Sequence, residues 1–230
     1  MHTIYHYPLC PFSRSVRLVA GEYGIEFNWV EEKAWDRRKD FLRLNPAGTV
    51  PVLETDTGAA ICGNTIIFEY VEEAGLAPSI SNSLMPEDPV ARAEMRRVIA
   101  WFDQKFNEEV TRNLVVEKID RRFSPKEFGG GPPDGNAVRA GLANIRYHLQ
   151  YIGFLAARSS WLCGDAITYA DLCAAAHLSC VDFLGDVPWS ENVDAKNWYA
   201  RIKSRPAFRT LFTDKIRGMT VPTSYADLDF

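Results

Sequence analysis

The stretch TIYHYPLCPFSRSVRLVAGEYGIEFNWVEE (residues 3–32) decides the first part of the fold. Its opening residues are rich in β-formers and are stopped by two prolines, which predicts a strand followed by a turn. Apolar residues then recur at helical spacing, and Gly24 follows them as the expected C-cap. The last eight residues alternate apolar and polar side chains, which predicts a second strand. The stretch is therefore a strand–helix–strand unit.

The alternation of strands and helices continues beyond this unit. DRRKDFLRLN (residues 36–45) has the spacing of a short helix. TVPVLET (residues 49–55) and AAICG (residues 59–63) flank the turn sequence DTG, which predicts a β-hairpin. NTIIFEYVEEAG (residues 64–75) returns to helical spacing. The order βαβαββα predicts a mixed sheet with helices packed on it.

The rest of the chain is helical in pattern. Residues 77–89 are rich in Ser and Pro and predict a linker, and the consecutive glycines in FGGGPPDGN predict a loop. We expect helices in residues 90–119, 137–159, 168–184 and 195–212. The expected fold class is α/β followed by all-α, with an N-terminal domain at 1–76, the linker at 77–89, and an all-helical domain at 90–230 that ends in an extended tail at 220–230.

Composition restricts the function classes. The chain has 230 residues and a net charge of −4, with no basic stripe, which argues against a nucleic-acid partner. No apolar run reaches the roughly 18 residues that span a bilayer, and the N-terminus lacks the pattern of a secretion signal. The five cysteines are scattered and form no CxxC motif, so we expect neither disulfides nor a metal site. These features predict a reduced, cytoplasmic protein.

Cys10 stands at the start of the first predicted helix. A helix N-terminus carries partial positive charge and free N–H groups, and Arg14 is close in sequence. This setting predicts a thiol pKa lowered below about 8.5 and a reactive thiolate. The alternative is an inert cysteine that fills a turn.

Two further motifs have structural interpretations. In ITYADL (residues 167–172), Thr168 caps the next helix and Asp171 reaches back to the cap amide, which predicts a variant of the capping box. In TVPVL, Pro51 cannot donate to a strand ladder. A cis Val50–Pro51 bond would explain it, and a trans proline at a strand start is the alternative.

The order and spacing of PLCPFSRSVRL, LNPAGTVPVLE, IIFEYVEE, WLCGDAITYADL and WYARIKSRPAF resemble the glutathione S-transferase superfamily over nearly the whole chain. The resemblance implies a thioredoxin-like first domain and a homodimer. It also implies that glutathione, a small-molecule thiol, is the co-substrate for thiol transfer or for conjugation to an electrophile. No metal is implied.

The resemblance assigns roles to particular residues. Cys10 falls at the catalytic position, as hydrogen-bond donor to the glutathione thiolate or as nucleophile in disulfide exchange. The glutathione-binding residues would be Phe12, Val50, cis-Pro51, Asn64 and Thr65. The electrophile would lie between the domains, against the helix that holds Trp101 and Phe102.

One position departs from the family pattern. Gly63-Asn64 stands where relatives carry an acidic residue and a serine that hold the γ-glutamyl end of glutathione. Asn64 is expected to cap the helix, but Gly63 offers no charge to the ammonium group. Losing one charge-assisted hydrogen bond costs about 1.5–3 kcal/mol, which predicts weak glutathione binding.

The tail VPTSYADLDF (residues 221–230) ends on an aromatic carboxylate. It either docks on its own domain or binds a partner. With EKAWDRR (residues 32–38), it resembles the glutathione-transferase-like bacterial division proteins that bind FtsZ. That resemblance implies a non-enzymatic adaptor as the alternative function, and its partner-binding residues would be Trp35, Tyr225, Asp227, Asp229 and Phe230. The alternative for Trp35 is packing under its own loop.

Overall fold

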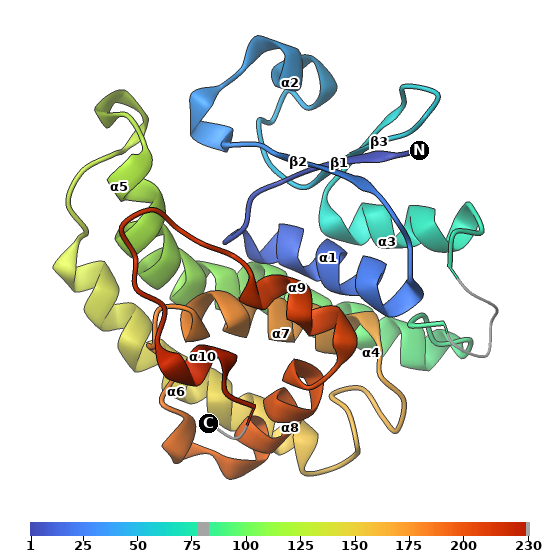
Figure 1. Cartoon of the computed structure of the whole chain (residues 1–230). Coiled ribbons are helices and arrows are strands. Elements are labelled where there is room, and N and C mark those ends of the chain that lie inside the picture. The colour runs from blue at the N-terminus through green and yellow to red at the C-terminus, as the bar shows by residue number, and fades with distance from the viewer. Residues whose placement is uncertain (78–82, 229–230) are drawn as a thin grey trace.

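The computed structural model describes residues 1–77 and 83–228 (Figure 1), so part of the predicted linker, Asp229 and Phe230 lie outside the described residues. The N-terminal domain contains β1 (Thr3–His6), α1 (Pro11–Tyr23), β2 (Asn28–Glu31), η1 (Ala34–Asp36), α2 (Lys39–Leu44), β3 (Val52–Glu54), β4 (Ala60–Cys62) and α3 (Asn64–Glu73). The sheet order is β2-β1-β3-β4, with β1 parallel to β2 and antiparallel to β3. The predicted βαβαββα order is confirmed.

Local chemistry explains where these elements begin and end. α1 starts at Pro11, whose missing N–H is not needed at the first helical position. It ends at Gly24, whose left-handed φ of 66° lets its N–H bond the carbonyl of Ala20. The β3–β4 hairpin closes through Gly58 at φ 86°, as the DTG turn predicted.

The helical domain follows the predicted pattern with one difference. Its elements are α4 (Pro89–Ala100), η3 (Trp101–Asp120), α5 (Arg121–Phe123), η4 (Lys126–Phe128), α6 (Gly135–Ala156), α7 (Tyr169–Asp182), η5 (Trp189–Glu191), α8 (Val193–Lys203), η6 (Pro206–Phe208), α9 (Arg209–Phe212) and α10 (Thr223–Ala226). α4, η3 and α5 form one continuous helical run, with π-type winding in η3. The single helix predicted over 195–212 is wrong, because Pro206 disfavours helical geometry in the residue before it and α8 ends at Lys203.

α7 is the centre of the core. All its residues are buried, and it packs against α1, α4, η3 and α8. Its capping box is confirmed, because the Thr168 amide donates to Asp171 Oδ2 at 2.9 Å and Thr168 Oγ1 accepts from the Ala170 amide. α1 lies between the sheet and the helical domain (Figure 1), so α1 and α7 join the two domains. Within residues 1–77 and 83–228, no helix has the length and hydropathy of a membrane span.

Candidate functional site

Cys10 occupies the N-cap position of α1, at the turn that leaves β1. Its Sγ donates to the carbonyl oxygen of Val50 at 3.6 Å. The Val50–Pro51 peptide bond is cis, as the family resemblance implied. The structure therefore brings together the two segments that were expected to flank the sulfur of glutathione.

The predicted low pKa of Cys10 is wrong. Burial raises the pKa of the thiol to about 11, and hydrogen bonds from Ser13 and the Phe12 amide, which lower it, are weaker effects. Arg14 was expected to assist the thiolate, but its guanidinium makes its hydrogen bonds to other groups. At neutral pH, Cys10 in this conformation is a thiol that donates a hydrogen bond.

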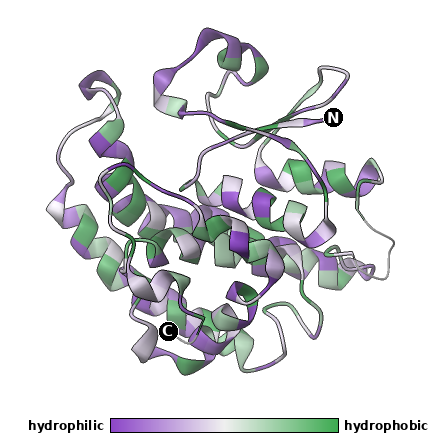
Figure 2. Cartoon of the chain, in the orientation of Figure 1, coloured by the Kyte–Doolittle hydropathy of each residue, from purple (hydrophilic) through white to green (hydrophobic). Residues whose placement is uncertain are grey.

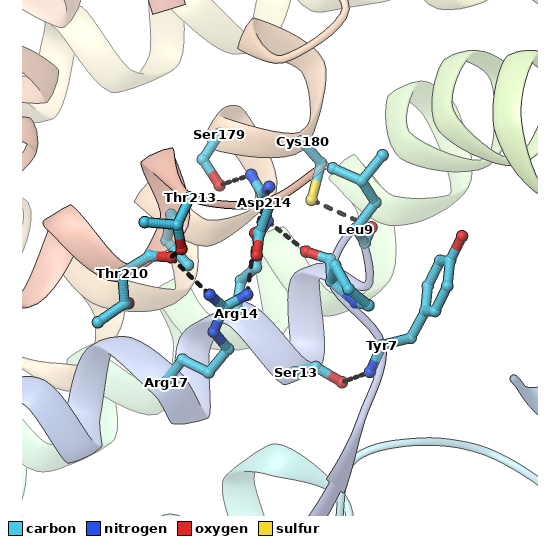
Figure 3. Close-up of polar contacts among 12 residues, drawn as sticks. Tyr7, Leu9, Ser13, Arg14, Arg17, Ser179, Cys180, Thr210, Thr213 and Asp214 are labelled. Carbon is cyan, nitrogen blue, oxygen red and sulfur yellow. Dashed lines mark hydrogen bonds and ion pairs between the residues drawn. The ribbon is translucent and has the colours of Figure 1, made fainter. Parts of the chain in front are cut away.

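Arg14 joins the Cys10 turn to the helical domain (Figure 3). Its side chain is fully buried, and its Nε donates to the carbonyl of Pro8 at 2.7 Å. Its Nη1 donates to Ser179 Oγ at 2.9 Å and to the hydroxyl of Tyr225 at 3.1 Å. Its Nη2 pairs with Asp214 Oδ2 at 2.9 Å. One guanidinium thus fixes the turn before Cys10 against α7 and the C-terminal segment.

The C-terminal segment docks, at least in part, on its own domain. Tyr225 in α10 is only 1% exposed, and its hydroxyl donates to the carbonyl of Leu211 at 3.3 Å. Of the two alternatives for the tail, the structure places Tyr225 in the docked one, so this ring is not a surface for a partner. Asp227 is exposed.

A cavity of about 490 Å³ opens beside the N-terminus of α3, and we call it the α3 cavity. Three predicted glutathione-binding residues line it, namely Phe12, Asn64 and Thr65. Asp103 and Gln104 of η3 also line this cavity. The cavity therefore lies where the γ-glutamyl end of glutathione was expected.

Asn64 does not cap α3, contrary to the prediction. Gly63 is the N-cap, with a φ of 95°, and Asn64 is the first helical residue. The side chain of Asn64 instead donates to Asp103 Oδ2 at 2.8 Å, while His177 Nε2 lies 3.2 Å from Asp103 Oδ1. Asp103 is a carboxylate of this cavity that the sequence analysis missed. It comes from a helix 39 residues further along the chain, and no motif marks it.

A second cavity, of about 570 Å³, includes Tyr7 and Pro8 of the turn before Cys10, and we call it the Trp35 cleft. Trp35 of η1 and Phe123 of α5 also line it. The ring of Trp35 meets that of Tyr7 edge-on, with centroids 5.0 Å apart, so Trp35 is half-buried. The residues that follow it, 36–40, are all hydrophilic (Figure 2).

The helix that holds Trp101 and Phe102, against which the electrophile was expected, lines the α3 cavity through Asp103 and Gln104 and not through these two side chains. Phe102 is fully buried. Trp101 turns toward α6, where its indole N–H donates to His148 at 3.1 Å and its ring lies 4.2 Å from that of Tyr151. These two side chains form core and helix–helix contacts because the helix faces the site with Asp103 instead.

Asp120, at the end of η3, is a second carboxyl group that the sequence analysis missed. Burial raises its pKa to about 7, and its Oδ1 has no hydrogen-bond partner. The charge of Asp120 also contributes to the raised pKa values of Tyr7 and Cys10. A titratable carboxyl group thus influences the thiol from the helical domain.

A thioredoxin-like domain with a cysteine beside a cis-proline, followed by a helical domain, defines the fold class of glutathione transferases. The chain belongs to the glutathione S-transferase family: the family's N-terminal domain model matches residues 9–74 and its C-terminal domain model matches residues 141–206.

Individual relatives match over the full length. FtsZ-localized protein A of Caulobacter vibrioides is 42% identical, over 99% of this chain and 98% of that protein. The crystal structure of a glutathione S-transferase from Sinorhizobium meliloti has a TM-score of 0.96 and 48% identity, covering 100% of both chains. The structure of FzlA from C. crescentus has a TM-score of 0.91 and 41% identity, covering 100% of this chain and 99% of that one. The expected family and fold class are confirmed.

Proposed function

We propose that this chain binds glutathione for thiol transfer or conjugation to an electrophile. The observation that carries the proposal is the position of the Cys10 thiol opposite the Val50 carbonyl. Cys10 itself lines neither cavity, but its neighbours do: Phe12 lines the α3 cavity and Pro8 lines the Trp35 cleft. The glutathione sulfur would lie at Cys10, and its γ-glutamyl end would enter the α3 cavity.

The α3 cavity supplies groups for both charges of the γ-glutamyl end. Backbone N–H groups at the start of α3 and the hydroxyl of exposed Thr65 suit the α-carboxylate. Asp103 provides a carboxylate for the ammonium group that Gly63 cannot bind. Because the Cys10 thiol has a pKa of about 11, its role is to donate a hydrogen bond to the bound thiolate.

Calorimetric titration with glutathione tests this proposal. We expect Cys10→Ser to keep binding, because a hydroxyl also donates, and Asp103→Asn to weaken it about ten- to a hundredfold. Asp40→Asn is the matched control, since Asp40 is exposed and lines neither cavity. No heat from the wild type at millimolar glutathione would contradict the proposal.

We include a homodimer and a cytoplasmic location in the proposal. Ile66, on α3 at the mouth of the α3 cavity, is 58% exposed, and a second copy would cover it. Light scattering of Ile66→Asp should show a monomer; an unchanged mass would remove Ile66 from the interface. All five cysteines are free, which suits a reducing compartment.

A second candidate function is binding to FtsZ filaments as an adaptor. It is favoured by the full-length similarity to a protein named for its localisation with FtsZ. Trp35 and exposed Asp227 are the described residues that we assign to this surface, together with Asp229 and Phe230. Co-sedimentation with FtsZ filaments tests it, with Trp35→Ala and a deletion of residues 228–230 expected to reduce pelleting. The deletion leaves buried Tyr225 in place, so it does not disturb the docked part of the tail. A full-length protein that never pellets with the filaments would contradict the adaptor function.

A further inference from the structure

Strand β2 forms one edge of the sheet and leaves backbone groups unpaired. It pairs with β1 on one side, and the order β2-β1-β3-β4 places no described strand on the other side. The amides of Asn28 and Glu32 donate to backbone carbonyls on the β1 side. Because the backbone groups of successive residues alternate in direction along a strand, those of Trp29 and Glu31 point away from β1. The edge therefore offers the N–H and C=O groups of two residues to a further strand.

A cavity of about 720 Å³ lies beside this edge, between β2, α1 and α9, and we call it the β2–α9 groove. Trp29 lines it from β2, and Gly21 and the C-cap residue Gly24 line it from α1 without side chains. Arg17 holds α9 beside α1, because its Nη2 donates to the carbonyl of Thr210 at 2.7 Å (Figure 3). The groove shares no lining residue with the α3 cavity or the Trp35 cleft, so it is a separate feature of the molecule.

Trp29 joins the unpaired edge to the groove. The residue is 37% exposed, although its indole ring meets the ring of His6 edge-on at 5.3 Å and that of Phe27 at 5.8 Å. These contacts position the ring at the mouth of the groove. Tryptophan is favoured at binding hot spots, because it buries a large apolar area at a small cost in conformational entropy. An apolar side chain placed against this ring would leave water.

The charges of the groove favour a carboxylate. Arg17, Arg209 and Glu26 line it, and His6 is uncharged at neutral pH because burial lowers its pKa to about 4. Arg17 is neutralised by Asp214 at 2.9 Å. Arg209 is exposed and forms no ion pair with another described side chain, Glu26 included. Its guanidinium is therefore available to an acidic group of a ligand.

We propose that the β2 edge and the β2–α9 groove bind an extended peptide segment of a partner protein. The segment adds a strand beside β2 through the backbone groups of Trp29 and Glu31. A large apolar side chain of the segment lies in the groove against Trp29, and an acidic residue next to it pairs with Arg209. In this mode of recognition, main-chain hydrogen bonds supply affinity and the side-chain pocket supplies sequence preference. The site depends neither on glutathione binding nor on the adaptor surface assigned to Trp35 and the tail.

Selection from a phage-displayed library of random dodecapeptides on the full-length protein tests the inference. We expect the enriched peptides to share a large apolar residue next to Asp or Glu. The affinity of the most enriched peptide, labelled with fluorescein, is then measured by fluorescence anisotropy on the wild type and on variants.

A matched pair of variants isolates the backbone pairing. Glu31→Pro removes the outward N–H and leaves the β1 side of the strand unchanged, as proline does in natural edge strands. It should weaken peptide binding about tenfold, whereas Glu31→Ala, which keeps the N–H, should stay within about twofold of the wild type.

Side-chain variants test the groove. Trp29→Ala should weaken the peptide by at least about tenfold, and Arg209→Gln by about threefold, as expected for an exposed ion pair. Arg112→Gln makes the same change in net charge at an exposed arginine that does not line the groove, and it should leave the affinity unchanged.

Amide hydrogen exchange of the wild type, followed by NMR, locates the added strand without any substitution. The amides of Trp29 and Glu31 should exchange more slowly when the peptide is bound, while that of Asn28, already paired on the β1 side, should change little. Protection confined to other segments, equal affinities of Glu31→Pro and Glu31→Ala, an equal loss in Arg112→Gln, or a library without enriched peptides overturns the proposal.

Discussion

Replacing Arg14 by methionine tests whether one guanidinium fixes the two domains together. Methionine keeps the apolar stem but removes the hydrogen bonds to Pro8, Ser179 and Tyr225 and the ion pair to Asp214. Removing one partner of a buried ion pair costs about 3–5 kcal/mol. Asp214 keeps its pair with Arg17 at 2.9 Å, so we expect the lower end of that range, about 3 kcal/mol.

Urea unfolding followed by tryptophan fluorescence measures this loss, and the melting temperature should fall by about 6–12 °C for a chain of this size. Arg17→Met is the matched control. Its side chain is 10% exposed, it donates to the carbonyl of Thr210 at 2.7 Å, and its removal leaves Asp214 paired with Arg14, so it should cost less than Arg14→Met, about 1–2 kcal/mol. A loss below 1 kcal/mol in Arg14→Met, or equal losses in the two variants, would refute the reasoning.

Two other substitutions probe buried titratable groups, and a third probes the close contact between α1 and η6. The folded-state pKa of Asp120, about 7, exceeds its usual 3.8, so the free energy of unfolding of the wild type should fall by about 2 kcal/mol from pH 5 to pH 8. Asp120→Asn should not show this fall in urea titrations. Parallel pH profiles of the two proteins would contradict this. The pKa of His148 is lowered to about 4 by burial, so stability falls as pH drops from 6.5 to 4, and His148→Gln should flatten that fall by about 2–3 kcal/mol in the same assay. Gly21→Ala places a Cβ 2.8 Å from the Cβ of Ala207, so we expect a lower melting temperature, equivalent to a loss of about 1–3 kcal/mol. An unchanged melting temperature would show that α1 and η6 can move apart to accept the methyl group.

Local signals were sufficient for most of the fold. Gly24, the DTG turn and the Thr168–Asp171 pair each act within a few residues, and the structure contains all three as predicted. Errors arose where one residue changes its neighbour's conformation, as Pro206 does for the end of α8. The cis state of the bond before Pro51 came from the family resemblance, because a sequence pattern does not distinguish it from the commoner trans form.

The candidate site likewise contains some residues that were predicted before the structure and others that were missed. Cys10 stands at a recognisable helix start, and the family resemblance assigned Phe12 and Asn64 to the same site. Asp103 and Asp120 lie on η3 with no motif around them, and they reach the site only because η3 packs against α7. The lining of the β2–α9 groove comes from residues 6–29 and 209–213, so the groove is visible only after folding.

Cys10 shows how a correct position can give a wrong chemical prediction. The N-terminus of a helix stabilises a negative charge by about 0.3–1 kcal/mol at exposed sites. The rise of its pKa from 9.0 to about 11 corresponds to about 3 kcal/mol against the thiolate, so burial outweighs the helix. Sequence analysis could place Cys10 at the helix start but could not predict the protein around it. A neutral thiol at that position, whose hydrogen can turn from the Val50 carbonyl to a bound molecule, suits the binding of another molecule's thiolate better than attack by its own sulfur.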